Sequence, residues 1–341
     1  MRKLEFVCEK LGERERGFLS FDESENFYLT GFRSTFSIVL ITGRERALLF
    51  TDGRYIERAK EEVKGFEVVE WKGWDEFNRN LKEEVEEVIV DPERIKASTL
   101  KKIEVPVIEE EGFLRELRSV KTPEEVSLIT RAVQIAEISL KSVLHLLKPG
   151  ITEVEFRREL LSAFFKFGGE GEAFPTIVAS GRNSAIPHWE TGSREIKDGD
   201  VVIVDFGTVY RGYVSDITRT FLIGNVPTEM REVYEAVREA QEVGIGELKP
   251  GKSCSEVDLK VREFLEKKGL SEYFVHSLGH GIGVEVHESP TLSRRSREVL
   301  RRGNVVTVEP GVYIPGLGGV RIEDDCLITE EGAFQISSLE K

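Results

Sequence analysis

An acidic residue stands inside what would otherwise be a wholly apolar strand. The run Val201-Val-Ile-Val-Asp-Phe206 has the near-continuous apolar character of a strand buried in a protein core, yet it contains Asp205. An ionised carboxylate that is buried without a partner costs many kcal/mol. We therefore expect the fold to bring a cation to Asp205.

A second aspartate follows at a spacing that suggests a hairpin. Ten residues separate Asp205 from Asp216. If the chain folds back around Tyr210 and Arg211, the two aspartates face each other across paired strands, with Cβ atoms about 5 Å apart. Two like charges at that distance also require a cation.

Two glutamates repeat this pattern later in the chain. Glu309 ends an apolar strand in Val305-Val-Thr-Val-Glu-Pro-Gly311. Glu323 lies in Val320-Arg-Ile-Glu-Asp-Asp325, where strand alternation places it on the same face as Arg321. Taken singly, an acidic residue at a strand end is more often a turn or capping residue than a ligand. Four carboxylates in apolar strand settings favour a shared cation site.

The histidines are concentrated in loops of the same half of the chain. Only His145 lies in an ordinary helical pattern, and the others lie in Pro- and Gly-marked segments: His188, His276, His280 and His287. Glycine on both sides of His280 gives the backbone freedom to bring its imidazole close to other groups. His280 is therefore the strongest candidate for a nitrogen ligand.

A carboxylate-rich set with one imidazole favours Mn²⁺ or Co²⁺, with Zn²⁺ and Fe²⁺ as alternatives. Four negative charges are balanced by two divalent ions, so we infer a dinuclear site. Two such ions activate water and polarise a carbonyl, which is the chemistry of amide hydrolysis. The sequence contains no Walker loop, nucleophile elbow, His-Glu-x-x-His motif or dinucleotide-binding glycine pattern that would support another chemistry.

The composition of the chain disfavours membrane-spanning and nucleic-acid-binding proteins. The chain has 341 residues, enough for two domains, with 40% hydrophobic and 32% charged residues and no apolar run long enough to cross a membrane. Lys plus Arg total 48 against 62 Asp plus Glu, a net charge of −14 that disfavours nucleic acid as a partner. Three scattered cysteines and the absence of a signal-peptide pattern at the N-terminus predict a cytoplasmic protein.

The periodicity of apolar residues predicts a small α/β domain first, because short apolar runs alternate there with polar helical segments. The runs are Phe36 to Ile41, Ala47 to Phe50, Phe66 to Val69, Val85 to Val90 and Val105 to Ile108. A helix then ends near Val120, and Thr122 has the pattern of an N-cap for the next helix. We place the domains at residues 1–121 and 122–341.

The second domain is predicted to be α+β, with its helices in blocks rather than alternating with strands. The predicted helices are Pro123 to Leu147, Thr152 to Phe167, Glu229 to Leu248 and Ser253 to Lys268.

Five motifs in this second domain, in this order, resemble the pita-bread metallopeptidases, and within them prolidase and aminopeptidase P. They are Val204-Asp-Phe-Gly207, Ser215-Asp-Ile-Thr-Arg-Thr220, His276-Ser-Leu-Gly-His-Gly-Ile-Gly283, Val306-Thr-Val-Glu-Pro-Gly311 and Val320-Arg-Ile-Glu-Asp-Asp325. Tyr28-Leu-Thr-Gly-Phe32 and Thr51-Asp-Gly-Arg-Tyr55 resemble the creatinase/prolidase N-terminal domain. The resemblance implies a pita-bread catalytic domain preceded by a smaller α/β domain.

The resemblance also implies a ligand set. By it, Asp205 chelates one metal ion, His280 and Glu309 bind the other, and Asp216 and Glu323 bridge the two. Glu309 would in addition be a proton shuttle beside a metal-bridging hydroxide.

The same resemblance assigns roles around the metals. It places His188 and His287 beside the substrate, and Arg321 where a guanidinium orients the carboxylates near the bridging Glu323. One position departs from the pattern: many microbial prolidases continue the His-Glu-x-Pro stretch with an arginine thought to hold a dipeptide's carboxylate, and here Thr291 follows. The nearby Arg294, Arg295 or Arg297 could supply that charge, although a run of arginines is more often a solvated turn.

The expected function is therefore that of a dinuclear metal-dependent exopeptidase, an Xaa-Pro dipeptidase or Xaa-Pro aminopeptidase, with proline-containing peptides as substrates and a homodimer as its assembly. Two other functions exist on the same fold, a creatinase-like amidinohydrolase and a non-catalytic binding protein. Both kinds of relative lose metal ligands, and this sequence keeps all five. A methionine aminopeptidase would lack the first domain.

Overall fold

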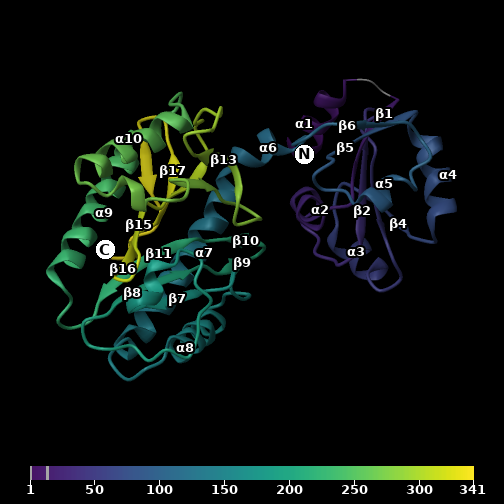
Figure 1. Cartoon of the computed structure of the whole chain (residues 1–341). Coiled ribbons are helices and arrows are strands. Elements are labelled where there is room, and N and C mark those ends of the chain that lie inside the picture. Colours follow the sequence, from purple (N-terminus) through teal and green to yellow (C-terminus); the bar gives the residue numbers. More distant parts are fainter. Residues whose placement is uncertain (1, 13–14) are drawn as a thin grey trace. The chain divides into compact units, whose positions relative to one another are not determined.

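The computed structural model describes residues 2–12 and 15–341, which form two compact units, Met1–Leu117 and Arg118–Lys341 (Figure 1). The sequence placed the boundary slightly later, between residues 121 and 122. Arg118 already forms ion pairs with Glu285 and Glu288 of the second unit, so the chain makes contacts within that unit before the helix at Thr122 begins. Among the described residues, no helix is both long and apolar enough to cross a lipid bilayer.

The first unit is an α/β domain built on one six-stranded sheet with the order β4-β3-β2-β1-β5-β6. Its strands are β1 (Arg16–Ser20), β2 (Ser37–Thr42), β3 (Ala47–Thr51), β4 (Glu67–Glu70), β5 (Glu87–Val90) and β6 (Val107–Glu109). Its helices are α1 (Arg2–Leu11), α2 (Glu23–Thr30), α3 (Ile56–Glu62), α4 (Trp74–Glu84) and α5 (Ala97–Leu100), and α6 (Arg115–Ser119) leads into the second unit. The five predicted strands are present. The sequence analysis missed β1, which pairs with both β2 and β5 in the centre of the sheet.

The second unit repeats one order of elements twice, a helix pair followed by strands. The first half contains α7 (Pro123–Val143), α8 (Glu153–Lys166), β7 (Ile177–Ser180), β8 (Val201–Phe206), β9 (Val209–Tyr210), β10 (Tyr213–Val214) and β11 (Ile217–Leu222), with short 3-10 helices η1 (Leu144–Leu146) and η2 (Gly181–Ala185). β11, β8 and β7 form one sheet. The predicted N-cap at Thr122 is confirmed as a capping box with Glu125, and Thr152 forms another with Glu155.

The second half contains α9 (Thr228–Glu247), α10 (Cys254–Lys267), η3 (Ser271–Tyr273), β12 (Gly279–Gly281), β13 (Glu288–Leu292), β14 (Val305–Val308), β15 (Gly311–Ile314), β16 (Gly318–Arg321), β17 (Asp324–Ile328) and β18 (Ala333–Gln335). Five of these strands form a sheet in the order β13-β12-β14-β17-β18. The helix pair α7 and α8 buries its apolar face in one hydrophobic core, and α9 and α10 bury theirs in another. Each core also takes in residues of the other half, such as Val305 in the first core and Val201 in the second. The predicted α+β class is confirmed.

The hairpin that carries the two aspartates turns one residue later than the sequence predicted. Tyr210 pairs with Tyr213, so the turn residues are Arg211 and Gly212, with φ angles of 47° and 83°. Positive φ at both central residues is the geometry of a tight hairpin turn, and glycine adopts it without strain. Asp205 consequently lies opposite Thr218, and Asp216 is a diagonal neighbour rather than the direct partner.

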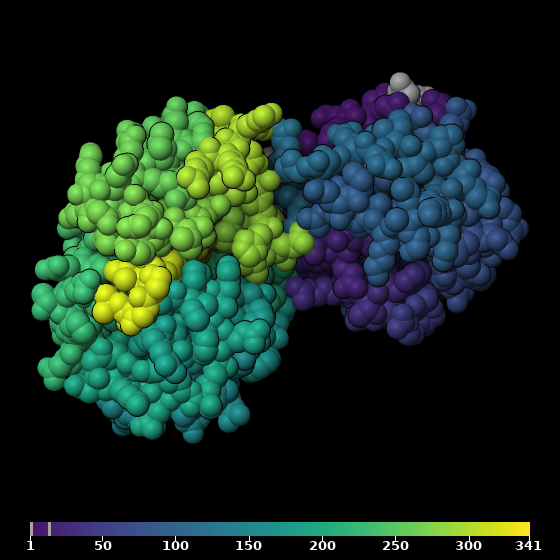
Figure 2. Space-filling view, in the orientation of Figure 1, coloured from purple at the N-terminus to yellow at the C-terminus, as the bar shows by residue number. Residues whose placement is uncertain are grey.

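A buried arginine joins the two halves. Arg219 in β11 is 1% exposed and forms an ion pair of 2.6 Å with Asp324 of β17. It also donates to the backbone carbonyls of Glu323 and Leu339. The C-terminal segment, yellow in Figure 2, accordingly lies in the seam between the teal first half and the green second half.

We expect Arg219→Met to destabilise the fold strongly. Without Arg219, the buried carboxylate of Asp324 keeps only the longer contact of 3.5 Å with Lys341. Removing one partner of a buried ion pair costs about 3 to 5 kcal/mol. Urea denaturation measures the loss. Arg238→Met is the matched control, because Arg238 pairs with Glu235 and Glu242 on the solvent side of α9, where a pair contributes at most about 1 kcal/mol. Equal losses in the two variants would contradict the assignment.

Candidate active site

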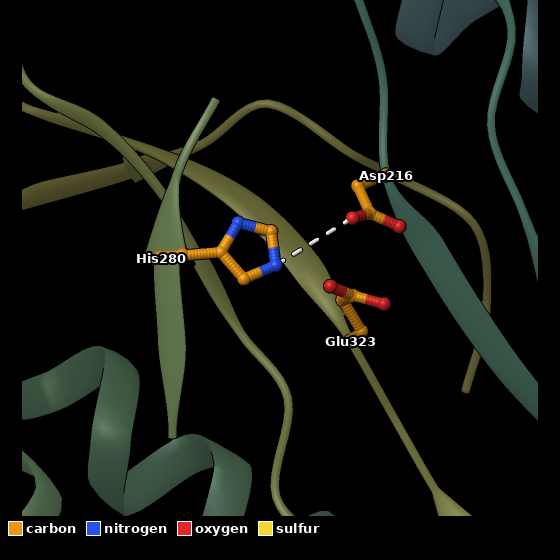
Figure 3. A group of neighbouring side chains, drawn as sticks. All are labelled: Asp216, His280 and Glu323. Atoms are coloured by element: carbon orange, nitrogen blue, oxygen red, sulfur yellow. Dashed lines mark ion pairs between the residues drawn. The ribbon is translucent and has the colours of Figure 1, made fainter. Parts of the chain in front are cut away.

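Three predicted ligands from distant parts of the second unit meet in one cluster. Asp216 directly precedes β11, His280 lies in β12, and Glu323 lies in the short segment between β16 and β17. One ligand atom from each lies within 4.8 Å of the others. Figure 3 shows the imidazole of His280 directed toward the two carboxylates, with its Nε2 3.7 Å from Asp216 Oδ2.

Glu309 lies beside this cluster. It follows β14, and its Oε1 is 3.3 Å from His280 Nε2. Burial alone would lower the pKa of His280, but the hydrogen bond with Glu309 raises it above its ordinary value. Burial would likewise raise the pKa of Glu309, but the same hydrogen bond lowers it. These two side chains therefore form a polarised pair at the edge of the cluster.

Glycines allow His280 to reach this position. A Cβ added to Gly279 would lie 2.0 Å from the backbone oxygen of Thr307, and one added to Gly281 would lie 2.4 Å from that of Ser289. Side chains at these two positions would collide with neighbouring backbone. The sequence predicted these glycines for their conformational freedom, whereas the structure requires them for the close approach of neighbouring backbone.

Asp205 contacts a cation that the protein itself supplies. Its Oδ2 accepts a hydrogen bond of 2.6 Å from Arg321. Burial raises the pKa of Asp205, and the charge of Arg321 opposes that rise. The sequence analysis placed Arg321 near Glu323, and the connection runs through Thr218, whose hydroxyl accepts from Arg321 Nε and donates to Glu323 Oε2.

The remaining charges repel one another. Burial raises the pKa of Asp216 well above its ordinary value, and the charges of Glu323 and Asp205 raise it further. Burial does the same to Glu323, with Glu309 and Asp205 adding to the effect. Arg321 and His280 offset only part of this repulsion, which is the electrostatic setting of a cation site.

Carboxylate oxygens without a hydrogen-bond donor indicate whether the cluster is suited to metal ions. Among the described residues, three buried carboxylate oxygens of this region have no hydrogen-bond donor: Asp205 Oδ1, Glu323 Oε1 and Asp325 Oδ1. Buried polar atoms in folded proteins are nearly always satisfied, so such orphans require an explanation. Oxygen-rich ligands with one imidazole suit divalent cations, and the set therefore fits metal ions.

The two histidines expected beside the substrate are both exposed at the edge of the cluster. The ring of His287 lies 4.2 Å from that of His280, centroid to centroid. Although His287 is exposed as a residue, its imidazole is partly desolvated beside His280. This desolvation and then the charge of His280 lower the pKa of His287, and His188 adds to the effect. The backbone carbonyl of Pro187, next to His188, accepts from Arg321 at 3.3 Å.

Sequence reasoning missed three supporting residues. Tyr313 accepts from Arg321 at 2.7 Å and lies 3.0 Å from His276 Nε2. Asp325 accepts from the backbone N–H of Asp216 and so fixes its position. Thr218 joins Arg321 to Glu323, as described above. Of these three, only Asp325 could have been recognised from the sequence. It adds a further carboxylate to an apolar stretch close to Glu323.

Glu288 follows His287 but has a different environment. It is paired with Arg118 at 2.6 Å and with Lys121 at 2.9 Å, and it accepts from the backbone N–H of Val284. Burial alone would raise the pKa of Glu288, but the charges of Lys121 and Arg118 lower it to about 2. Glu288 therefore fixes the loop that carries His287.

The two-domain fold and the buried carboxylate and histidine cluster together define the class, a hydrolase of the metallopeptidase kind. Residues 127–330 match Metallopeptidase family M24, and residues 13–120 match the Creatinase/Prolidase N-terminal domain. The chain belongs to family M24. It is therefore an enzyme, and the family implies divalent metal ions.

Solved structures and curated relatives agree with this assignment. A structure of an Xaa-Pro dipeptidase from Bacillus anthracis is 38% identical, with a TM-score of 0.96, and covers 100% of this chain and 98% of that one. An X-Pro aminopeptidase from Thermotoga maritima is 36% identical, with a TM-score of 0.90 and 98% coverage of both chains. A Xaa-Pro dipeptidase of Pyrococcus furiosus is 37% identical over 326 residues, 92% of this chain and 91% of the relative.

We expect Asp216→Asn to empty or half-empty the metal site while the fold stays cooperative. The amide keeps the shape of the side chain but lacks the charge that would attract two cations. Elemental analysis and thermal unfolding of the reconstituted protein measure the two effects. Asp75→Asn, at an exposed position in α4, is the control. Wild-type metal content in Asp216→Asn would show that Asp216 is not a ligand.

We expect Glu288 to contribute stability that depends on pH. Its folded pKa of about 2 lies below the ordinary 4.5, so the ionised form stabilises the fold above pH 4.5 and the contribution disappears as the pH falls toward 2. A shift of this size corresponds to about 3 kcal/mol. Urea denaturation at falling pH should show the difference between wild type and Glu288→Gln shrinking across this window. A difference that stays constant would contradict the shift. Glu331→Gln, at an exposed position, is the control.

Proposed function

We propose that this enzyme is an exopeptidase that hydrolyses the bond between an N-terminal residue and a following proline. The observation that carries the proposal is the cluster of Asp216, His280 and Glu323 with Glu309 beside it, buried and unbalanced in charge. The names of its relatives support the substrate class, since they are Xaa-Pro dipeptidases and an X-Pro aminopeptidase.

The residues that would hold two divalent ions are the five predicted ligands, Asp205, Asp216, His280, Glu309 and Glu323. When bound, such ions supply an activated water and polarise the scissile carbonyl. The composition of the ligand set favours Mn²⁺ or Co²⁺, with Zn²⁺ and Fe²⁺ as alternatives. The homodimer and the cytoplasmic location remain predictions drawn from the resemblance and from composition.

The chain's own side chains have distinct tasks in this proposal. Glu309 accepts and returns a proton, because its carboxylate is polarised by His280 and adjoins the ligands. His188 and His287 donate to the substrate from exposed positions at the rim. Arg321 holds Asp205 and, through Thr218, Glu323 in place.

We expect activity on Xaa-Pro dipeptides or Xaa-Pro-Yaa tripeptides to disappear when the metal is stripped and to return with Mn²⁺ or Co²⁺. Charge balance predicts close to two ions per chain at full activity. Peptide hydrolysis measured together with elemental analysis tests both statements. Full activity in excess chelator with no bound metal would overturn the metal mechanism, and a peptide without proline in second position is the substrate control.

Thr291 provides a test of substrate length. It lies directly opposite His280 in the pairing of β12 with β13, so the two side chains share one face of the sheet. We expect Thr291→Arg to lower KM for Xaa-Pro dipeptides relative to tripeptides, because a guanidinium there can pair with the dipeptide carboxylate. Thr291→Gln, of similar length without charge, is the control. An equal change for both substrates would contradict this placement.

A further inference from the structure

A carboxylate remote from the ligand cluster is fully buried beneath the loop that carries His188. Glu153 is the first residue of α8 and is 0% exposed. Its Oε1 accepts from the backbone N–H of Ser180 at 2.8 Å, from the Ser180 hydroxyl at 2.7 Å and from the Asn183 amide at 2.9 Å. Its Oε2 accepts from the indole N–H of Trp189 at 2.9 Å and from the backbone N–H of Gly192 at 3.3 Å.

These five donors all come from one segment, residues 180–192. Four of them are groups that can only donate, so the ionised carboxylate is the form that satisfies the whole set. The buried charge is thus balanced mainly by loop groups rather than by a direct ion pair. Arg194 assists through Ser180, because it donates to that hydroxyl at 2.6 Å while pairing with Asp200.

The loop is anchored immediately on both sides of His188. Before it, the carbonyl of Pro187 accepts from Arg321, which also holds Asp205. After it, the Trp189 indole is held by Glu153 and packs against a small apolar cluster with Tyr313. The contacts of Pro187 and Trp189 fix the backbone on both sides of His188. The side chain of His188 is exposed, so its imidazole is accessible to a substrate.

Residues of the loop further from His188, on both sides of it, are also fixed by hydrogen bonds. Ser184 accepts from the backbone N–H of Gly319 in β16 at 2.8 Å. The carbonyls of Gly192 and Arg194 accept from the first N–H groups of α8, those of Val154 and Glu153. Glu153 therefore stands at the centre of a contact between the start of α8 and the loop.

We propose that Glu153 is a positioning residue for the reaction, acting through His188. Its charge gathers the donors of the loop so that His188 is held at the distance from the ligand cluster that a substrate requires. This inference rests on the proposed function, in which His188 donates to the substrate. A merely structural Glu153 would stabilise the fold without affecting catalysis selectively.

The test is Glu153→Gln, which keeps the size of the side chain but turns an NH₂ group toward some of the donors. We expect kcat to fall by at least about tenfold with little change in KM, because a displaced catalytic donor weakens transition-state binding. Metal content should stay at the wild-type level. Glu155→Ala is the matched control, since it removes the capping box of the same helix without touching the loop, and it should lower stability but leave kcat unchanged.

A double-mutant cycle distinguishes an effect of Glu153 that acts through His188 from a general loss of structure. In a His188→Ala background, Glu153→Gln should lower kcat by less than about twofold, because the group it positions is already gone. Trp189→Phe keeps an aromatic side chain but removes the indole N–H together with the pyrrole part of the ring, so it should reproduce part of the loss of kcat if Glu153→Gln fails to fold. Additive losses in the cycle, or wild-type kcat in both Glu153→Gln and Trp189→Phe, would overturn the proposal.

A measurement that does not depend on catalysis separates the positioning role of Glu153 from the proposed peptidase function. NMR of the histidine side chains in the Zn²⁺-loaded protein, with His188 assigned from His188→Ala, should show the His188 resonance shifted in Glu153→Gln and unshifted in Glu155→Ala. An unshifted resonance in Glu153→Gln would contradict the role of Glu153. If the wild-type enzyme hydrolysed no Xaa-Pro peptide, the proposed function would fail, and this measurement would still show whether Glu153 positions His188.

Discussion

Repulsion among buried carboxylates is the constraint on which the second unit depends. Asp205, Asp216, Glu309 and Glu323 raise one another's cost of ionisation, and burial raises the pKa of Asp216 and Glu323 well above the ordinary range. A fold that stabilised only itself would disperse these charges or pair each one. This fold instead brings them together from strands of both halves, with His280 between Asp216 and Glu309. Cations bound at the proposed metal site would offset this repulsion and so stabilise the arrangement.

Elsewhere the protein compensates its buried acids with its own donors. Asp324 is neutralised by Arg219, and Glu288 is neutralised by Arg118 and Lys121. Each of these pairs also fixes a segment next to the cluster: the turn at Glu323 and the loop before His287. The fully paired carboxylates therefore support the fold, and the partly paired ones form the proposed metal site.

The rim of the site follows the same physical logic. The side chains expected to meet a substrate are exposed, but the backbone that carries them is held by buried charge. Glu153 gathers five donors beneath the loop of His188, and Arg321 fixes Pro187 on its other side. An enzyme that must place donors accurately around a small peptide needs such support, because an error of about 1 Å in placement can cost about a hundredfold in rate.

Local patterns in the sequence determined the four long helices of the second unit, the two-domain order and the residues whose charge conflicts with an apolar strand. Thr122 and Thr152 begin helices because capping requires only residues three positions apart, and Asp205 is conspicuous within its own run of six. Tertiary structure alone decided the partners. The pairing of Asp205 with Thr218 depends on a turn at Arg211 and Gly212, and the link from Arg321 to Glu323 passes through Thr218. Glu153 looked like an ordinary first-turn acid of a helix, because its donors lie 27 to 39 residues away and sequence periodicity carries no information about contacts at that range.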